Sequence, residues 1–137
     1  MSLQSEEIPD LQILYRYAKR AAFPIGQDEI PASIFNDPEL SCDWALYQKN
    51  PESSYHISEG KEIIVEITVC DDIRNPKNPK RGNPEPPWKQ DIFHNPMEAI
   101  GSHPANFSHS LIKGVKKKVV TDALISSSIF RNKDRLL

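Results

Sequence analysis

The chain has 137 residues and a formal net charge of −2, with 38% hydrophobic residues and 12 prolines. This length fits one domain spanning residues 1–137, and the low hydrophobic share indicates a modest core with long loops. The slightly acidic balance argues against a protein that binds polyanions over its whole surface, although a local basic patch stays compatible with it. No apolar run approaches the length of a membrane span.

The beginning of the sequence is polar and has no apolar segment of the kind found in signal peptides. The two cysteines, Cys42 and Cys70, follow no metal-binding or redox spacing. We therefore expect a cytoplasmic protein with both thiols reduced. No motif in the chain calls for a cofactor or a metal.

The N-terminal part predicts a flexible arm followed by one strand. Residues 1–9 are mostly polar and are expected to be an arm. Residues 11–17 alternate as a strand but also place Leu11, Leu14 and Tyr15 on one helical face. Their aromatic content favours the strand, which we expect at an edge of the sheet.

Short helices are predicted in the rest of the first half. Asp37 precedes Pro38, which is typical of a helix start, so we expect a short helix within 38–48 that buries Trp44. Asn50-Pro51 repeats the signal and predicts another helical turn to about residue 57.

The second half predicts three antiparallel strands, near 62–68, 88–94 and 107–113. The first is the clearest, because Ile63, Val65 and Ile67 point to one face and polar residues mostly to the other. A capping-box pattern beginning at Thr68 predicts a helical turn to about residue 74.

A C-terminal helix near 115–126 is expected to cover one face of this sheet. Its apolar positions recur at helical spacing and are Val115, Val119, Val120, Ala123 and Leu124. Residues 127–137 are expected to be a tail. With the short helices of the first half, the prediction is an α+β fold.

Residues 75–87 are predicted to form a long proline-rich loop. They contain five prolines together with Lys77, Lys80 and Arg81. Proline cannot continue a regular element, and loops of this length are often functional or disordered. Trp88 follows this loop, and we expect it to be largely exposed.

Several short segments match a known pattern. They are Leu14-Tyr15-Arg16, Ala32-Ser33-Ile34-Phe35, Ser41-Cys42-Asp43, Ile73-Arg74 and Asn106-Phe107-Ser108-His109, with Gly114 and Lys116 after them. Over residues 14–125 the chain resembles a group of small uncharacterised prokaryotic proteins. Phe107 stands where the pattern prefers proline, and loop 75–87 looks like an insertion. The resemblance implies one compact domain and singles out His109 and Asp43, and it implies no activity.

A catalytic hypothesis centres on His109. This residue lies between Ser108 and Ser110, whose hydroxyl groups can satisfy the ring nitrogens, so we predict a structural role. No nucleophile elbow, zinc spacing or glycine-rich phosphate loop accompanies it. His56-Ile-Ser58 and His109-Ser-Leu are similar to the motifs of two-histidine phosphoesterases, but the second lacks the hydroxyl group.

Basic residues gather in two places, at Lys77, Lys80, Arg81 and Lys89 and at Lys113, Lys116, Lys117 and Lys118. Pairing of the strands 88–94 and 107–113 would bring both sets to related ends of one hairpin, where Trp88 could stack on a base. The candidate binding residues are Lys77, Lys80, Arg81, Trp88, Lys113, Lys116 and Lys117.

The absence of a clear catalytic set and the long proline loop favour a non-catalytic binding or adaptor domain within a larger prokaryotic protein assembly. Its partner would be a protein. Two alternatives stay open. One is an enzyme acting on a nucleotide or nucleic acid, with His109 as acid/base, Asp43 as its possible second site residue and the lysines holding phosphate. The other is a nucleic-acid-binding module that uses the lysine clusters.

Overall fold

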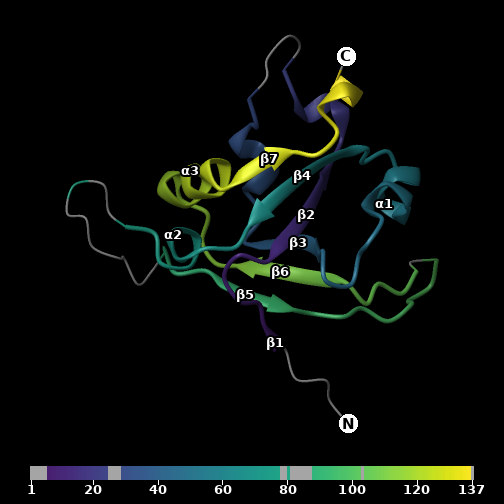
Figure 1. The fold of residues 1–137 in the computed structure, drawn as a ribbon, viewed down its shortest axis with the longest axis horizontal. Helices are drawn as coiled ribbons and strands as arrows, with labels where there is room; N and C mark the ends of the chain where they lie inside the picture. Colours follow the sequence, from purple (N-terminus) through teal and green to yellow (C-terminus); the bar gives the residue numbers. More distant parts are fainter. Residues whose placement is uncertain (1–5, 25–28, 78–79, 81–87, 103, 137) are drawn as a thin grey trace.

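The computed structural model describes residues 6–24, 29–77, 80, 88–102 and 104–136. Within them, seven strands form one antiparallel sheet in the order β1-β5-β6-β3-β2-β4-β7 (Figure 1). The strands are β1 (Glu6–Glu7), β2 (Ile13–Ala18), β3 (Glu39–Trp44), β4 (Ile63–Thr68), β5 (Asp91–His94), β6 (His109–Lys113) and β7 (Ser128–Phe130). The α-helices are α1 (Tyr55–Ser58), α2 (Asp71–Arg74) and α3 (Lys118–Ser126). The α+β fold class is therefore as predicted.

Short 3-10 helices complete the described chain: η1 (Arg20–Ala22), η2 (Ala32–Phe35), η3 (Pro51–Ser53) and η5 (Lys133–Leu136). None of the helices in the described residues is long and apolar enough to cross a membrane.

The two faces of the sheet bury different side chains, because successive strand residues point to opposite faces. Leu14 of β2, Leu40 of β3 and Ile112 of β6 belong to the main core, together with Val120 and Leu124 of α3. A smaller cluster contains Tyr15, Tyr17 and Ile64, against which Ile57 of α1 packs. The second cluster matters for function because it adjoins a group of buried polar side chains.

Residues 38–48 do not form the predicted helix, and most of them belong to β3. The side chain of Asp37 accepts a hydrogen bond from the Glu39 amide at 2.8 Å, so the cap signal starts a turn into a strand. Strands β2 and β6 lie on either side of β3 and satisfy its backbone groups, which outweighs a weak local helix signal. Trp44 is 2% exposed, so its predicted burial is confirmed.

Both ends of the chain contribute to the sheet, which corrects the predicted arm and tail. Glu6–Glu7 pair with β5, and Ile8 is fully buried, while residues 1–5 lie outside the described residues. Ser128–Phe130 form the edge strand β7 beside β4. The edges of a sheet leave backbone groups unpaired, and these two segments satisfy them.

The other predicted elements are found with shifted limits. Strand β4 is confirmed, and helical turns occur at 51–53, 55–58 and 71–74. Strands β5 and β6 pair with each other but begin at residues 91 and 109, and α3 begins at residue 118. Strand β2 lies inside the sheet between β3 and β4, so the prediction of an edge position is wrong.

Trp88 is half-buried and packs against the main core, so its predicted exposure is wrong. The Gln90 side-chain amide donates to the carbonyl oxygens of Trp88 and Val115, both at 2.9 Å, and ties this segment to the turn before α3.

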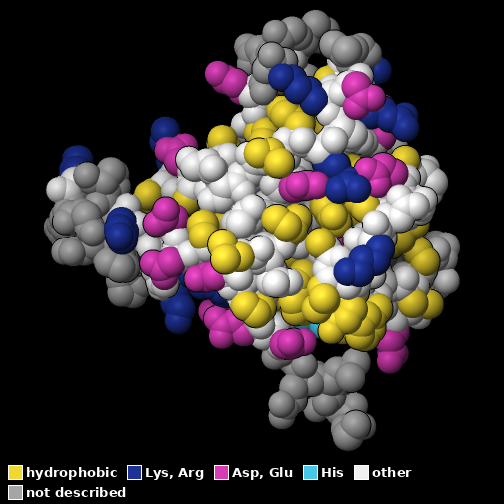
Figure 2. All heavy atoms as spheres, in the orientation of Figure 1, with side chains coloured by type: hydrophobic (Ala, Val, Ile, Leu, Met, Phe, Trp, Pro, Cys, Tyr) yellow, Lys and Arg dark blue, Asp and Glu magenta, His cyan; other side chains and the backbone are white. Residues whose placement is uncertain are grey.

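Of loop 75–87, residues 78–79 and 81–87 lie outside the described residues. On the face in Figure 2, hydrophobic and charged side chains are interspersed.

Candidate functional site

A narrow cleft lies where the central strands β2 and β3 diverge. The two strands share only the residue pairs Leu14 with Trp44 and Tyr15 with Asp43. Arg16 spans the widening gap: its Nε donates to the Ile34 carbonyl at 2.9 Å and its Nη1 to the Ser41 carbonyl at 3.1 Å. The cleft has a volume of about 40 Å³ and is lined by Arg16, Tyr17, Ser41, Cys42, His56, Lys61 and His109.

Strand register places Asp43 next to His109. Asp43 of β3 is opposite Tyr15 of β2 on one side and opposite His109 of β6 on the other. Directly opposed residues share a face and lie within side-chain reach. The structure thus brings together the two residues that the enzyme hypothesis names.

Asp43 is a buried carboxylate, 1% exposed. Its Oδ1 accepts a hydrogen bond from Asn106 Nδ2 at 2.7 Å, and Asn106 Oδ1 in turn accepts from the Ser108 hydroxyl at 2.7 Å. The Oδ2 atom lies 3.9 Å from His56 Nε2. Burying a carboxylate is costly unless hydrogen bonds or positive charge compensate for lost water, so Asp43 depends on these neighbours.

The hydrogen bonds of His109 determine its tautomer. The ring Nδ1 lies 2.8 Å from the Asn95 carbonyl oxygen, which can only accept, so Nδ1 carries the proton. In the neutral ring, Nε2 then accepts from the Ser41 hydroxyl at 3.2 Å. The ring nitrogens are therefore satisfied by a loop and by β3, and not by the flanking serines as predicted.

His56 reaches the same site from α1. The Ser54 side chain caps this helix by accepting a hydrogen bond from the His56 amide. The imidazole stacks on Tyr17 with a centroid distance of 4.4 Å and lies 4.1 Å from the Tyr55 ring. Burial lowers the pKa of His56 below its usual value, while the Asp43 charge acts in the opposite direction. The ring is therefore mainly neutral near pH 7.

Three buried polar atoms of this cluster make no hydrogen bond within the described residues: Tyr17 Oη, Asp43 Oδ2 and His56 Nδ1. Only one further buried side-chain atom in the described chain, Gln90 Oε1, shares this property. Burial and the Asp43 charge both raise the pKa of Tyr17, so its hydroxyl group keeps its proton. Such groups are rare in native structures, and their concentration here marks the cluster as the candidate functional site.

Several predicted binding residues have partners inside the fold. Lys116 Nζ donates to the carbonyl oxygens of Ile112 and Gly114, both at 2.9 Å, and burial lowers its pKa to about 8. Lys113 lies 3.9 Å from Glu39. Lys117 is exposed at the start of α3. Lys116 thus fixes the turn after β6 and is not free to hold a phosphate.

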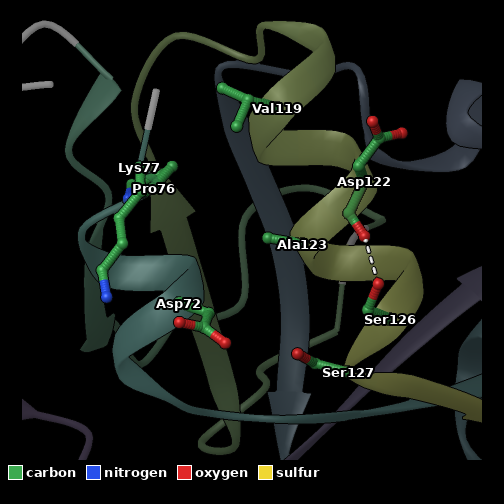
Figure 3. Close-up of a pocket in the computed structure, with 8 residues that line it drawn as sticks. All are labelled: Asp72, Pro76, Lys77, Val119, Asp122, Ala123, Ser126 and Ser127. Carbon is green, nitrogen blue, oxygen red and sulfur yellow. Dashed lines mark hydrogen bonds between the residues drawn. The ribbon is translucent and has the colours of Figure 1, made fainter. Parts of the chain in front are cut away.

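Lys77 belongs to a second cleft, of about 260 Å³, between α2 and α3 (Figure 3). Val119 and Ala123 contribute its apolar wall, and Asp72 and Asp122 contribute carboxylates. The mixed charge does not favour a nucleic-acid backbone. Lys80 is not among the residues that line this cleft. Arg81 lies outside the described residues.

Both cysteines are free thiols, and Cys42 offers little reactivity. Cys42 is buried, and burial raises its pKa to about 12. Cys70 Sγ lies 3.3 Å from the Ser127 hydroxyl oxygen. Among the residues that the structure describes, no group of His, Cys, Asp and Glu is arranged to hold a metal ion.

An aromatic surface lies beside the candidate site. His94 stacks on Tyr47 at 4.9 Å and meets Phe107 edge-on at 5.0 Å, with Trp44 behind it at 5.4 Å. Tyr47 is 43% exposed and Phe107 58% exposed. We call Tyr47 and Phe107 the aromatic surface, and His94, 5% exposed, lies beneath them.

Comparisons with known proteins identify no relative: no protein-family model, curated protein or solved structure matches this chain. Function is therefore argued from the geometry alone.

His56 is the member of the site that sequence reasoning missed. No motif surrounds it, because its partners come from β2 and β3, far away in the chain. The only signal was its weak pairing with His109 in the phosphoesterase-like pattern.

Proposed function

We propose that this chain is an acid–base enzyme in which His56 transfers the proton and Asp43 supports it. The observation that carries the proposal is the set of three unpartnered buried polar atoms, on Tyr17, Asp43 and His56, beside one small cleft. Groups with perturbed pKa values in a cleft are typical of catalytic sites. The acid–base role that the enzyme alternative assigned to His109 passes to His56, because both ring nitrogens of His109 already have partners.

The chemistry is general acid–base catalysis. A neutral His56 accepts a proton from a water molecule or substrate hydroxyl group and later returns it to the leaving group. The Asp43 carboxylate, 3.9 Å away, stabilises the positive charge that the imidazole carries between the two steps. His109, held by Asn95, fixes the Ser41 hydroxyl in the wall of the cleft.

Stability distinguishes a functional cluster from a structural one. The Tyr17→Phe variant should be as stable as the parent or up to about 1 kcal/mol more stable, because it removes a buried hydroxyl group that makes no hydrogen bond of normal geometry to its neighbours Asp43 and Ser54. Urea unfolding followed by circular dichroism measures the change. Tyr15→Phe on the same face is the matched control. A loss of about 1–3 kcal/mol in Tyr17→Phe would show that the hydroxyl group is structural.

The pH dependence of turnover tests the catalytic role. We expect hydrolysis of p-nitrophenyl acetate, p-nitrophenyl phosphate or bis(p-nitrophenyl) phosphate to increase as pH rises through the His56 pKa, which burial places below the usual value for histidine. In the Asp43→Asn variant this increase in hydrolysis should occur at lower pH, because the lost carboxylate no longer favours the protonated ring. His56→Gln should abolish turnover, and Lys49→Gln, at an exposed lysine outside the cleft, should leave it unchanged. Absence of any His56-dependent turnover would contradict the proposal.

A binding or adaptor domain is the second candidate function, and the aromatic surface favours it. Exposed aromatic side chains are enriched at protein interfaces, and Tyr47 and Phe107 are held in place by His94. The partner would be a protein segment that offers apolar side chains to these rings. Nucleic-acid binding is less favoured, since Lys116 is used inside the fold and Lys113 is paired.

A further inference from the structure

We propose that the cleft between β2 and β3 binds an oxyanion, the phosphate or carboxylate group of a ligand, and that Lys61 is its main cationic contact. The inference rests on the acid–base site proposed above and names the chemistry of the group that this site accepts.

The charge of the cleft favours an anion. Lys61 and Arg16 line it, and no carboxylate is among the lining residues. Lys61 is half-buried, and its ammonium group has no hydrogen-bond or ion-pair partner in the described part of the chain. Asp43 lies next to His56 and is bonded to Asn106, while Glu59 is exposed. Hydrogen bonds between a lysine ammonium group and an anionic oxygen are stronger than neutral ones, so an unpaired lysine at a cleft favours an anionic ligand.

The Tyr17 hydroxyl group and the size of the cleft also suit a small anion. Tyr17, 4% exposed, lines the cleft, and its hydroxyl group makes no hydrogen bond of normal geometry in the described residues, although Asp43 and Ser54 lie close to it. An O–H group is a good donor to an anionic oxygen. A water molecule needs about 10–15 Å³ of such space. The cleft, at about 40 Å³, therefore admits a single small charged group, and the rest of a larger ligand would stay outside.

Anion binding should be linked to a proton on His56. Its ring is surrounded by Asp43 of β3, Tyr17 of β2 and His109 of β6, and by Tyr55, Glu59 and Lys61 from its own segment. A negative charge added to the cleft favours the protonated ring. Affinity should therefore increase as pH falls through the His56 pKa.

Titration of the full chain with inorganic phosphate, followed by the NMR signals of the His56 ring, tests the inference. We expect a saturable shift, a higher His56 pKa in the presence of phosphate, and about tenfold weaker binding in Lys61→Gln. Lys49→Gln is the matched control, since it removes an exposed lysine that does not line the cleft, and its affinity should equal that of the parent. If Lys61→Gln does not fold, Tyr17→Phe removes another donor from the same cleft and should also weaken binding.

Absence of a saturable response, or equal affinity in the parent and Lys61→Gln, would overturn the inference. Parallel titrations with acetate and adenosine 5′-monophosphate identify the source of the anion. Preference for the nucleotide supports a phosphate ester, and equal binding of acetate and phosphate supports a small oxyanion in general. The two proposals can fail separately, because phosphate binding requires no turnover and turnover of a neutral ester requires no anion site.

Discussion

The Trp44→Ala variant should lose about 3–5 kcal/mol of unfolding free energy, a large part of the stability of a domain of this size. Trp44 is almost fully buried at the end of β3, and its indole nitrogen donates to the Gln12 side chain at 2.9 Å. Its ring also supports His94, with centroids 5.4 Å apart. The substitution therefore leaves a large cavity and an unpaired acceptor in one place. Urea unfolding followed by circular dichroism measures the loss.

Trp88→Ala provides the control for this experiment. Trp88 is only half-buried against the main core, so its removal should cost clearly less than that of Trp44. The structural account of Trp44 would be wrong if both variants lost the same stability.

Introducing a charge at Val120 should prevent stable folding. Val120 is fully buried on α3 and belongs to the main core together with Leu124. An unpaired carboxylate there costs several kcal/mol, which is comparable to the whole stability of a small domain. We expect Val120→Asp to show no cooperative thermal transition by circular dichroism.

Position 119 is the matched control, since it carries the same residue type one position earlier. Sequence spacing places both valines on the core side of the helix, but Val119 is half-buried at the rim of the α2–α3 cleft. Val119→Asp should therefore fold with a moderate loss, and Lys117→Glu should change stability by less than about 0.5 kcal/mol. Similar melting of the two aspartate variants would show that the helix faces the core differently.

Arg16 connects the central strands of the fold to the candidate site. Arg16 bridges β2 and β3 where their ladder ends, so the cleft exists because two central strands diverge. Because the ladder is short, the Arg16 side chain connects the two strands beyond its end. Space remains there for the imidazole rings of His56 and His109. The site is thus built into the centre of the sheet, while the aromatic surface lies beside it.

The sequence by itself determined the elements whose signal is local. Alternation of apolar residues from Ile63 to Ile67 identified β4, and the proline starts at 50–51 identified the helical turns before α1. The aromatic content of residues 11–17 identified β2. Such patterns survive in the fold because the strand or helix that they favour also buries the right face. They also sufficed for the α+β class, whereas the burial of Trp44 was predicted from a helix that the structure replaces with β3.

Part of the candidate site was also visible in the sequence. Asp43 and His109 were singled out by short motifs, and the structure places them on adjacent strands. His56 and the cleft were not predictable, because a contact between segments so far apart in the chain leaves no periodicity in the sequence.

Only the tertiary structure decided the remainder. The Asp37-Pro38 start signal is worth about 1 kcal/mol, whereas β6 pairs with β3 along Glu39 to Asp43 and β2 pairs with its last two residues, so the backbone hydrogen bonds of the strand outweigh the helix signal. The ends of the chain became β1 and β7 because the sheet left its edges unpaired. Lys116, which composition suggested for a ligand, is used to satisfy carbonyl oxygens at a turn. In each case a backbone group that had to be hydrogen-bonded in the folded state outweighed the local preference of the residues.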